Sequence, residues 1–137
     1  MGSRRQAREF ALQILYQLDI AKSPLPEVLE TFWQNNPSLD DTRDFAKKLV
    51  KGTLDNLAKI DELLAKYTEN WDIQRMASID RNILRSSTYE ILFCLDVPVN
   101  VVINEAVELA KKFSTAESGK FVNGVLDKLR RERKQKE

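Results

Sequence analysis

Apolar side chains recur every three or four residues along almost the whole chain, and this spacing limits the fold more than any other feature. Residues 4–20, for example, place Ala7, Ala11, Ile14 and Leu18 on one stripe of a helix. No segment alternates apolar and polar residues as a half-buried strand does. The sequence therefore predicts an all-α fold, a compact bundle of about seven helices. Five predicted helices cover residues 4–20, 25–35, 76–95, 99–112 and 116–131. Between the second and the last three, a third helix begins at Asp40 to Asp44 and a fourth carries Leu57, Ile60, Leu63, Leu64 and Tyr67.

Prolines, polar turns and capping residues separate the predicted helices. Gly52 and Asn56 are interpreted as a break near residue 55. Ser114 and Glu117 fit a capping box, in which Ser114 caps the last helix and Glu117 reaches back. The length of 137 residues predicts one domain over residues 1–131, followed by a charged and frayed tail over 132–137.

Residues suited to catalysis or metal binding are scarce. The chain has no His and a single Cys, which excludes an imidazole base and an ordinary zinc site of Cys and His ligands. Cys94 ends an apolar helix and is interpreted as a core residue. No glycine-rich nucleotide loop is present. We therefore expect a binding protein without enzymatic activity, cofactor or metal.

Acidic side chains have ordinary structural interpretations. Asp40, Asp41 and Asp44 suit the positive end of a helix, although carboxylates of this kind also bind cations. Glu105 and Glu108 are expected to be solvated.

Apolar runs are too short to span a membrane, and the N-terminus lacks the apolar core of a signal peptide. With only one cysteine as well, we expect a cytoplasmic protein without a membrane partner.

Positive charge is concentrated at the ends of the chain. Residues 1–22 carry a net charge of +2 and residues 128–137 of +4, whereas those between carry −5. Arg4, Arg5 and Arg8 lie within one to two turns, so a cluster of guanidiniums is expected where cations oppose the helix dipole. Basic ends on an acidic body suit a polyanion, while a solvated basic tail remains the alternative.

The stretch KFVNGVLDKL, residues 120–129, contains two poor helix formers inside a predicted helix. Asn123 suits reading of a base edge, and Lys120 suits a phosphate. Gly124 suits either tight helix packing or close approach of another molecule to the backbone. Phe121 is either a core residue or a stacking platform, and Tyr16 either a ring packed over its own helix or an exposed contact.

Three segments resemble one known family. They are RRQAREFALQILYQLD at 4–19, DRNILRSSTYEIL at 80–92 and PVNVVINEAVELAKKFSTAESGKFVNGVLDKL at 98–129. Together they resemble the NusB family of bacterial transcription antitermination factors. INEAVELAKKF followed by KFVNGVLD is the most specific part, whereas residues 22–56 match mainly in their helical pattern.

The resemblance implies seven helices in two packed subdomains. It implies binding of boxA RNA, a single-stranded element of ribosomal RNA operon leaders, together with the ribosomal protein NusE. It further implies assembly with other Nus factors on RNA polymerase, which makes elongation resistant to termination.

Family roles carried over by position divide the expected site into two parts. Gln6 interrupts the basic run RRQAR at a position where a further arginine occurs in the family, so RNA affinity is expected to be somewhat lower. Tyr16 and Asp80 are expected on the NusE side. The residues expected on the RNA side are Arg4, Arg5, Arg8, Tyr16, Glu117, Lys120, Phe121 and, from its own chemistry, Asn123.

Two other classes of function remain open. One is a helical adaptor that binds other proteins or forms a homodimer. In this alternative, the apolar stripe of residues 4–20 is incompletely covered in the monomer, and dimer formation hides the arginines. The other is the helical domain fused to ribosomal RNA cytosine methyltransferases, although the chain is too short for a catalytic domain.

Overall fold

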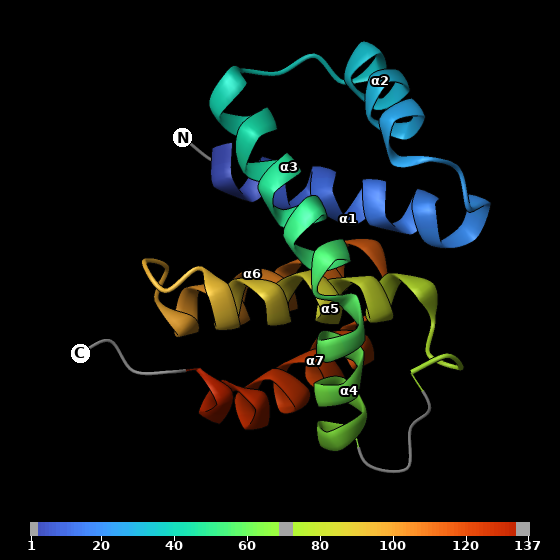
Figure 1. The fold of residues 1–137 in the computed structure, drawn as a ribbon. Coiled ribbons are helices and arrows are strands. Elements are labelled where there is room, and N and C mark those ends of the chain that lie inside the picture. The colour runs from blue at the N-terminus through green and yellow to red at the C-terminus, as the bar shows by residue number, and fades with distance from the viewer. Residues whose placement is uncertain (1–2, 69–72, 134–137) are drawn as a thin grey trace.

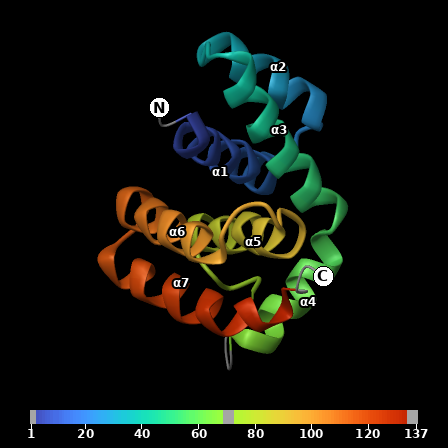
Figure 2. The ribbon, with the colours of Figure 1, turned by 90° about the vertical axis from the view of Figure 1, so that its left-hand side faces the viewer.

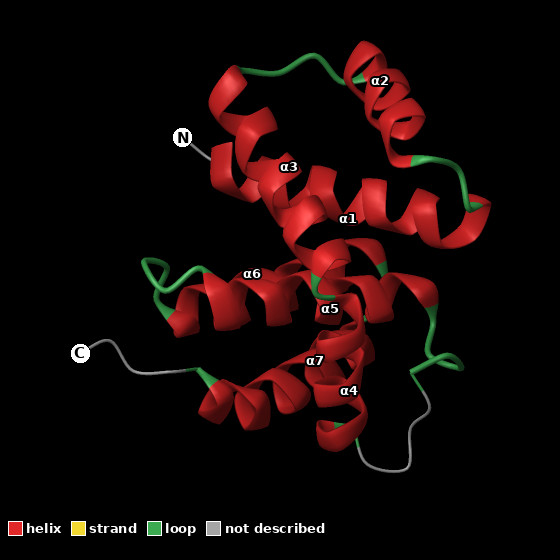
Figure 3. Ribbon diagram, viewed as in Figure 1, coloured by secondary structure: helices red, strands yellow, loops and turns green. Residues whose placement is uncertain are grey.

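Helices make up nearly all of the described structure, a computed structural model that covers residues 3–68 and 73–133 (Figure 3). The helices are α1 (Ser3–Ala21), α2 (Leu25–Asn35), α3 (Asp40–Asp55), α4 (Leu57–Tyr67), α5 (Ser78–Phe93), α6 (Val99–Phe113), α7 (Ala116–Leu129) and the short 3-10 helix η1 (Arg130–Glu132). No strand occurs in these residues. The predicted all-α fold with seven α-helices is confirmed, with small differences at the ends of α5 and α7.

Two subdomains pack against each other, as the family resemblance implied. Helices α1 to α3 form one half of the molecule and α4 to α7 the other (Figure 1). Helix α5 is central, since it packs against α1, α3, α4, α6 and α7. Three residues of the apolar stripe of α1, Ala7, Ala11 and Ile14, are 0% exposed, whereas Leu18 at its end is half-buried. The incomplete cover that motivated the homodimer alternative is therefore confined to Leu18, at the end of the stripe.

Local residues set several helix ends. Pro24 and Pro98 immediately precede α2 and α6, where their extended backbone suits a helix start. Asn56 separates α3 from α4, as predicted. The predicted capping box at α7 is wrong, because Thr115 is the cap and its side chain accepts from the backbone N–H of Ser118 at 2.9 Å.

The end of the described chain is tied to α5. Arg133 donates to the backbone carbonyl of Ile91 at 2.7 Å and to that of Cys94 at 3.2 Å. These bonds satisfy carbonyls at the C-terminal end of α5. The remainder of the predicted tail, residues 134–137, lies outside the described residues.

Gly52 makes room for a ring rather than breaking a helix. Helix α3 continues through this residue to Asp55, so its interpretation as part of the break is wrong. A Cβ at Gly52 would lie 2.1 Å from Cζ of Tyr89. That ring is itself stacked on Phe93, with a centroid distance of 5.3 Å. Gly52 therefore allows α3 to cross the Tyr89 ring of α5 at close range.

Gly52→Ala should destabilise the protein by about 1–3 kcal/mol, because overpacking at Tyr89 exceeds the gain of about 1 kcal/mol in helix propensity. Urea unfolding at equilibrium measures this change. Gly124→Ala is the matched control, since a Cβ there meets nothing within 4 Å and should stabilise α7. Equal stability changes for the two variants would contradict the packing argument.

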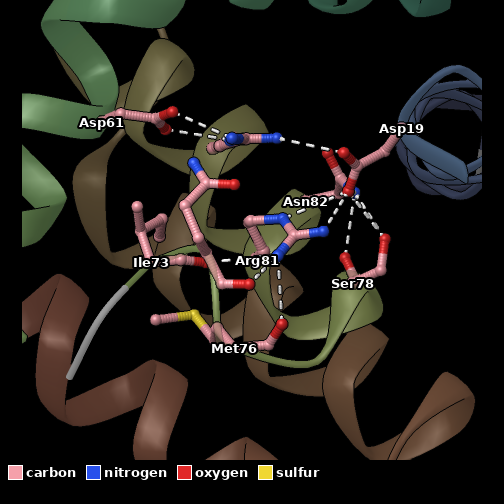
Figure 4. Close-up of polar contacts among 9 residues, drawn as sticks. Asp19, Asp61, Ile73, Met76, Ser78, Arg81 and Asn82 are labelled. Carbon is pink, nitrogen blue, oxygen red and sulfur yellow. Dashed lines mark hydrogen bonds and ion pairs between the residues drawn. The ribbon is translucent and has the colours of Figure 1, made fainter. Parts of the chain in front are cut away.

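A network of charged and polar side chains around Asp19 joins the C-terminal part of α1 to the start of α5 (Figure 4). Ser78 donates to the Asp19 carboxylate at 2.8 Å, and Arg81 donates from both Nε and Nη2. Arg81 also donates to the carbonyls of Ile73 and Met76, so it fixes the turn before α5. The network therefore links the two subdomains and orders the entry to the central helix.

The charge of Asp19 is stabilised by this network. Burial alone would raise the pKa of Asp19, but hydrogen bonds from Arg81, Ser78 and Asn82 outweigh burial and lower it. A lowered pKa in the folded state contributes stability above the ordinary pKa of about 4, and this contribution is lost as the pH falls through the folded value.

Asp19→Asn should cost about 1–3 kcal/mol at pH 7, because the charge-assisted bonds to Arg81 are lost. The difference in the free energy of unfolding between wild type and variant should decrease below about pH 4. Urea unfolding between pH 2.5 and 7 measures both the loss of stability and its dependence on pH. Asp127→Asn, which removes an exposed pair with Arg130, should stay within about 1 kcal/mol. A gap for Asp19→Asn that does not change with pH would disprove the electrostatic origin.

Candidate nucleic-acid interface

The three arginines at the start of α1 contact three different helices. Arg4 lies on the Phe45 ring of α3, with Cζ 3.9 Å from the ring centroid. Arg5 pairs with a carboxylate of α6, and Arg8 pairs with one of α5. Arg4 and Arg5 are exposed, whereas Arg8 is only 7% exposed. The three guanidiniums lie close together, since Arg8 shares the Phe45 ring with Arg4 and the Glu105 carboxylate with Arg5, but only Arg4 and Arg5 are exposed.

Arg8 is a buried structural cation. Its Nε and Nη2 donate to the two carboxylate oxygens of Glu90, each at 2.8 Å. Burial alone would lower the pKa of Arg8, but the hydrogen bonds and charge of Glu90 raise it. The guanidinium consequently stays charged inside the protein, and in this conformation it is not placed to contact RNA directly.

Glu105 of α6 pairs with Arg5 across the helix interface, which the sequence did not predict. Arg5 donates to it from Nε at 3.0 Å and from Nη2 at 2.7 Å. The hydrogen bonds from Arg5 lower the pKa of Glu105. The expectation that Glu105 is solvated without a partner is wrong. Its position beside the buried residues Val102, Ala106 and Leu109 was the available signal, since charges at such a border often pair with a neighbouring helix.

A second ion pair continues the contact between α1 and α6. Lys112 Nζ lies 2.9 Å from Oε2 of Glu9, one turn beyond Arg5. Arg5, Glu9 and Tyr16 follow one stripe of α1 at helical spacing. Tyr16 is 38% exposed, which favours the exposed alternative for its ring.

Helix α7, which packs against α6, places polar side chains at the surface. Lys120, Asn123 and Gly124 are exposed, and Lys120 lies 3.7 Å from the carboxylate of Glu117. The packing interpretation of Gly124 is wrong, because a Cβ there would meet open space. Phe121 is half-buried, with part of its ring packed against the core.

Asp80 lies near the start of α5 and contacts the first turn of α7. Its Oδ2 accepts a hydrogen bond from the Ser118 hydroxyl at 2.9 Å. Its Oδ1 is buried and has no hydrogen-bond partner among the described residues. Asp80 is thus half-buried beside α7 rather than fully exposed.

These segments lie side by side. Helix α6 lies between α1 and α7 on the left of Figure 2, and the ion pairs of Arg5 with Glu105 and of Glu9 with Lys112 tie α1 to α6. The first turn of α7 follows directly from the end of α6. The basic start of the chain and the polar helix near its end therefore contact the same helix, α6, although the sequence separates them by about a hundred residues.

Other residues have structural roles. Cys94 is 1% exposed, so its assignment to the core is confirmed. Asp40 and Asp41 occupy the first turn of α3, as predicted. Over residues 3–68 and 73–133, no group of three or more Cys, Asp or Glu side chains is placed to hold a metal ion. Every helix in the same ranges is too short or too polar to span a bilayer.

Comparison with known proteins identifies the family. The model of the NusB family matches residues 5–131. A transcription antitermination protein NusB from Desulfatibacillum aliphaticivorans is 46% identical over 129 residues, which cover 94% of this chain and 90% of the relative. The chain belongs to the NusB family. The family predicted from the three sequence segments is confirmed.

Solved NusB structures share the fold. T. maritima NusB has a TM-score of 0.88 and 37% identity, and the match covers 95% of this chain and 92% of that one. A second structure contains the antitermination factors NusB and NusE in complex with dsRNA. Its matching chain has a TM-score of 0.87 and 30% identity, with 96% of this chain and 98% of that one covered.

Arg8→Ala should destabilise the fold by about 3–5 kcal/mol, because it leaves the Glu90 carboxylate buried without its cation. Urea unfolding measures the loss. Arg4→Ala, at the exposed stack on Phe45, should cost no more than about 1 kcal/mol. Similar costs for the two variants would contradict the structural role assigned to Arg8, and would return it to the exposed RNA-binding set.

Proposed function

We propose that this chain is a transcription antitermination factor that binds boxA-type single-stranded RNA together with NusE. In this role it joins other Nus factors on RNA polymerase in the cytoplasm and makes elongation resistant to termination, with no catalytic step. Membership of the NusB family supports the proposal, as does similarity over nearly the full chain to a NusB solved with NusE and RNA.

The observation that carries the RNA part is the adjacency of α1, α6 and α7. Arg4, Arg5 and Lys120 are exposed cations near these helices and are proposed to contact phosphates, which gives salt-dependent affinity. Arg8 is proposed to act by holding α1 in place. Unstacked bases would then stack on Tyr16 or Phe121.

The polar residues of α7 complete the proposed RNA site. Asn123 is exposed and is proposed to read a base edge. Glu117 is proposed to lie at the edge of the site, where its charge moderates the attraction of Lys120 for phosphate.

The proposed NusE contact involves Asp80 and Tyr16. Asp80 supports the first turn of α7 through Ser118, so a partner bound beside it would also touch the RNA side. NusE would thereby raise apparent affinity by adding its own RNA contacts to the same RNA.

Fluorescence anisotropy of a labelled boxA-like RNA tests the proposal. We expect preference over a scrambled RNA, strengthening on addition of NusE, and weakening as salt rises. Lys120→Ala should weaken binding by about three- to tenfold. Lys51→Ala is the control, because Lys51 is an exposed cation of α3, outside the three helices of the proposed RNA site.

Two further measurements separate the alternatives. An unlabelled RNA duplex as competitor tests whether single strands are preferred. Light scattering over a range of protein concentrations tests the homodimer alternative. Equal binding of boxA-like and scrambled RNA under all conditions would refute the antitermination proposal for this chain.

A further inference from the structure

Glu105 holds Arg5 in the geometry that arginine uses for phosphate. Two hydrogen bonds join Nε and Nη2 of Arg5 to the two oxygens of Glu105, at 3.0 and 2.7 Å. A guanidinium binds two phosphate oxygens through the same fork. The Arg5 side chain is 60% exposed and Glu105 only 16%. The cation is therefore accessible from solvent, but its best hydrogen-bonding edge is already occupied.

Arg8 lies behind this pair and changes the cost of breaking it. Its Nη1 is 4.0 Å from Oε1 of Glu105, while Glu90 holds its Nε and Nη2. From the interior outward, the charges therefore alternate as Glu90, Arg8, Glu105 and Arg5. If Arg5 turned away, Glu105 would still face the positive charge of Arg8. Its carboxylate would not be left without a counter-charge, which is the main penalty for separating a buried pair.

We propose that Glu105 takes the place of an RNA phosphate on Arg5, and that RNA binding exchanges this carboxylate for a backbone phosphate while Arg8 retains it. This inference rests on the proposed RNA-binding function. Because one bidentate ionic contact replaces another, Arg5 contributes less to affinity than an unoccupied arginine would. Glu105 thus lowers the affinity of the isolated protein for any RNA, and binding depends more strongly on contacts elsewhere.

Glu105→Gln is the decisive variant. The amide oxygen still accepts a hydrogen bond from Arg5, so the side chain remains oriented, but the competing negative charge is removed. We expect RNA affinity to rise by about three- to tenfold in the anisotropy assay. A purely structural role for Glu105 would predict unchanged or weaker binding.

Glu108→Gln is the matched control for net charge. Glu108 lies almost one turn further along α6 and borders the same cavity as Arg5, but its nearest cation is Lys111 at 3.7 Å. This variant removes the same charge without freeing Arg5. Its effect on RNA affinity should stay below about twofold, since exposed charges are screened by salt.

An Arg5→Ala background completes the test. Without the guanidinium, Glu105→Gln should improve affinity no more than Glu108→Gln does. The gain in wild type and its loss in this background form a double-mutant cycle that isolates the competition for Arg5. Urea unfolding of each variant checks that the fold is retained.

The outcomes separate this inference from the proposed function. If wild type prefers boxA-like RNA but Glu105→Gln gains no more than Glu108→Gln, only the exchange is overturned. A gain that persists in the Arg5→Ala background also overturns it. If no variant binds RNA with preference, the proposed function fails and the exchange fails with it.

Discussion

The buried pair between Arg8 and Glu90 fixes the relation between the two subdomains. It joins α1, the first helix of one half, to α5, the central helix of the other, through two bonds of 2.8 Å. A paired charge so fully desolvated tolerates little rotation of α1, because any turn would leave a carboxylate without hydrogen bonds. The pair therefore determines which residues of α1 face outward. With Arg8 held inside, Arg5 and Tyr16 are left on the surface beside α6 and α7.

Helix α5 repeats this arrangement near its start. Arg81 binds Asp19 of α1, and Arg85 binds Asp61 of α4 through Nε at 2.9 Å and Nη2 at 2.8 Å. Helix α5 thus carries one cation that binds α1 of the other subdomain and one that binds α4 of its own subdomain. Buried ion pairs of this kind add little net stability compared with apolar packing, but a wrong helix register would leave each charge unpaired. We interpret them as the features that select one packing of α5 among the many that its apolar residues alone would allow.

Helical periodicity was sufficient to predict the fold, and insufficient to predict the site. The spacing of apolar residues predicted α2 over its observed bounds and placed α3 and α4 on either side of a break near residue 55, since the signal for a buried stripe is local. Gly52 was misread because its reason is Tyr89, which lies on another helix. Glu105 was wrongly predicted to be solvated because its partner, Arg5, also lies on another helix and is 100 residues away in the sequence. Patterns within one helix report which side is buried, but they do not report which charge meets which across a helix interface.

The start of α1 shows how long-range pairing alters a local argument. Its first turn contains no acidic residue, so cations there oppose the helix dipole and should destabilise the helix. Carboxylates from α5 and α6 supply the missing negative charge through Glu90 and Glu105, so the local cost by itself does not require an external polyanion. Gly124 leads to the opposite conclusion. It weakens α7 by about 1 kcal/mol relative to Ala. A Cβ there would meet nothing within 4 Å, so packing within the monomer does not compensate for this cost, and the backbone beside Asn123 stays open to solvent.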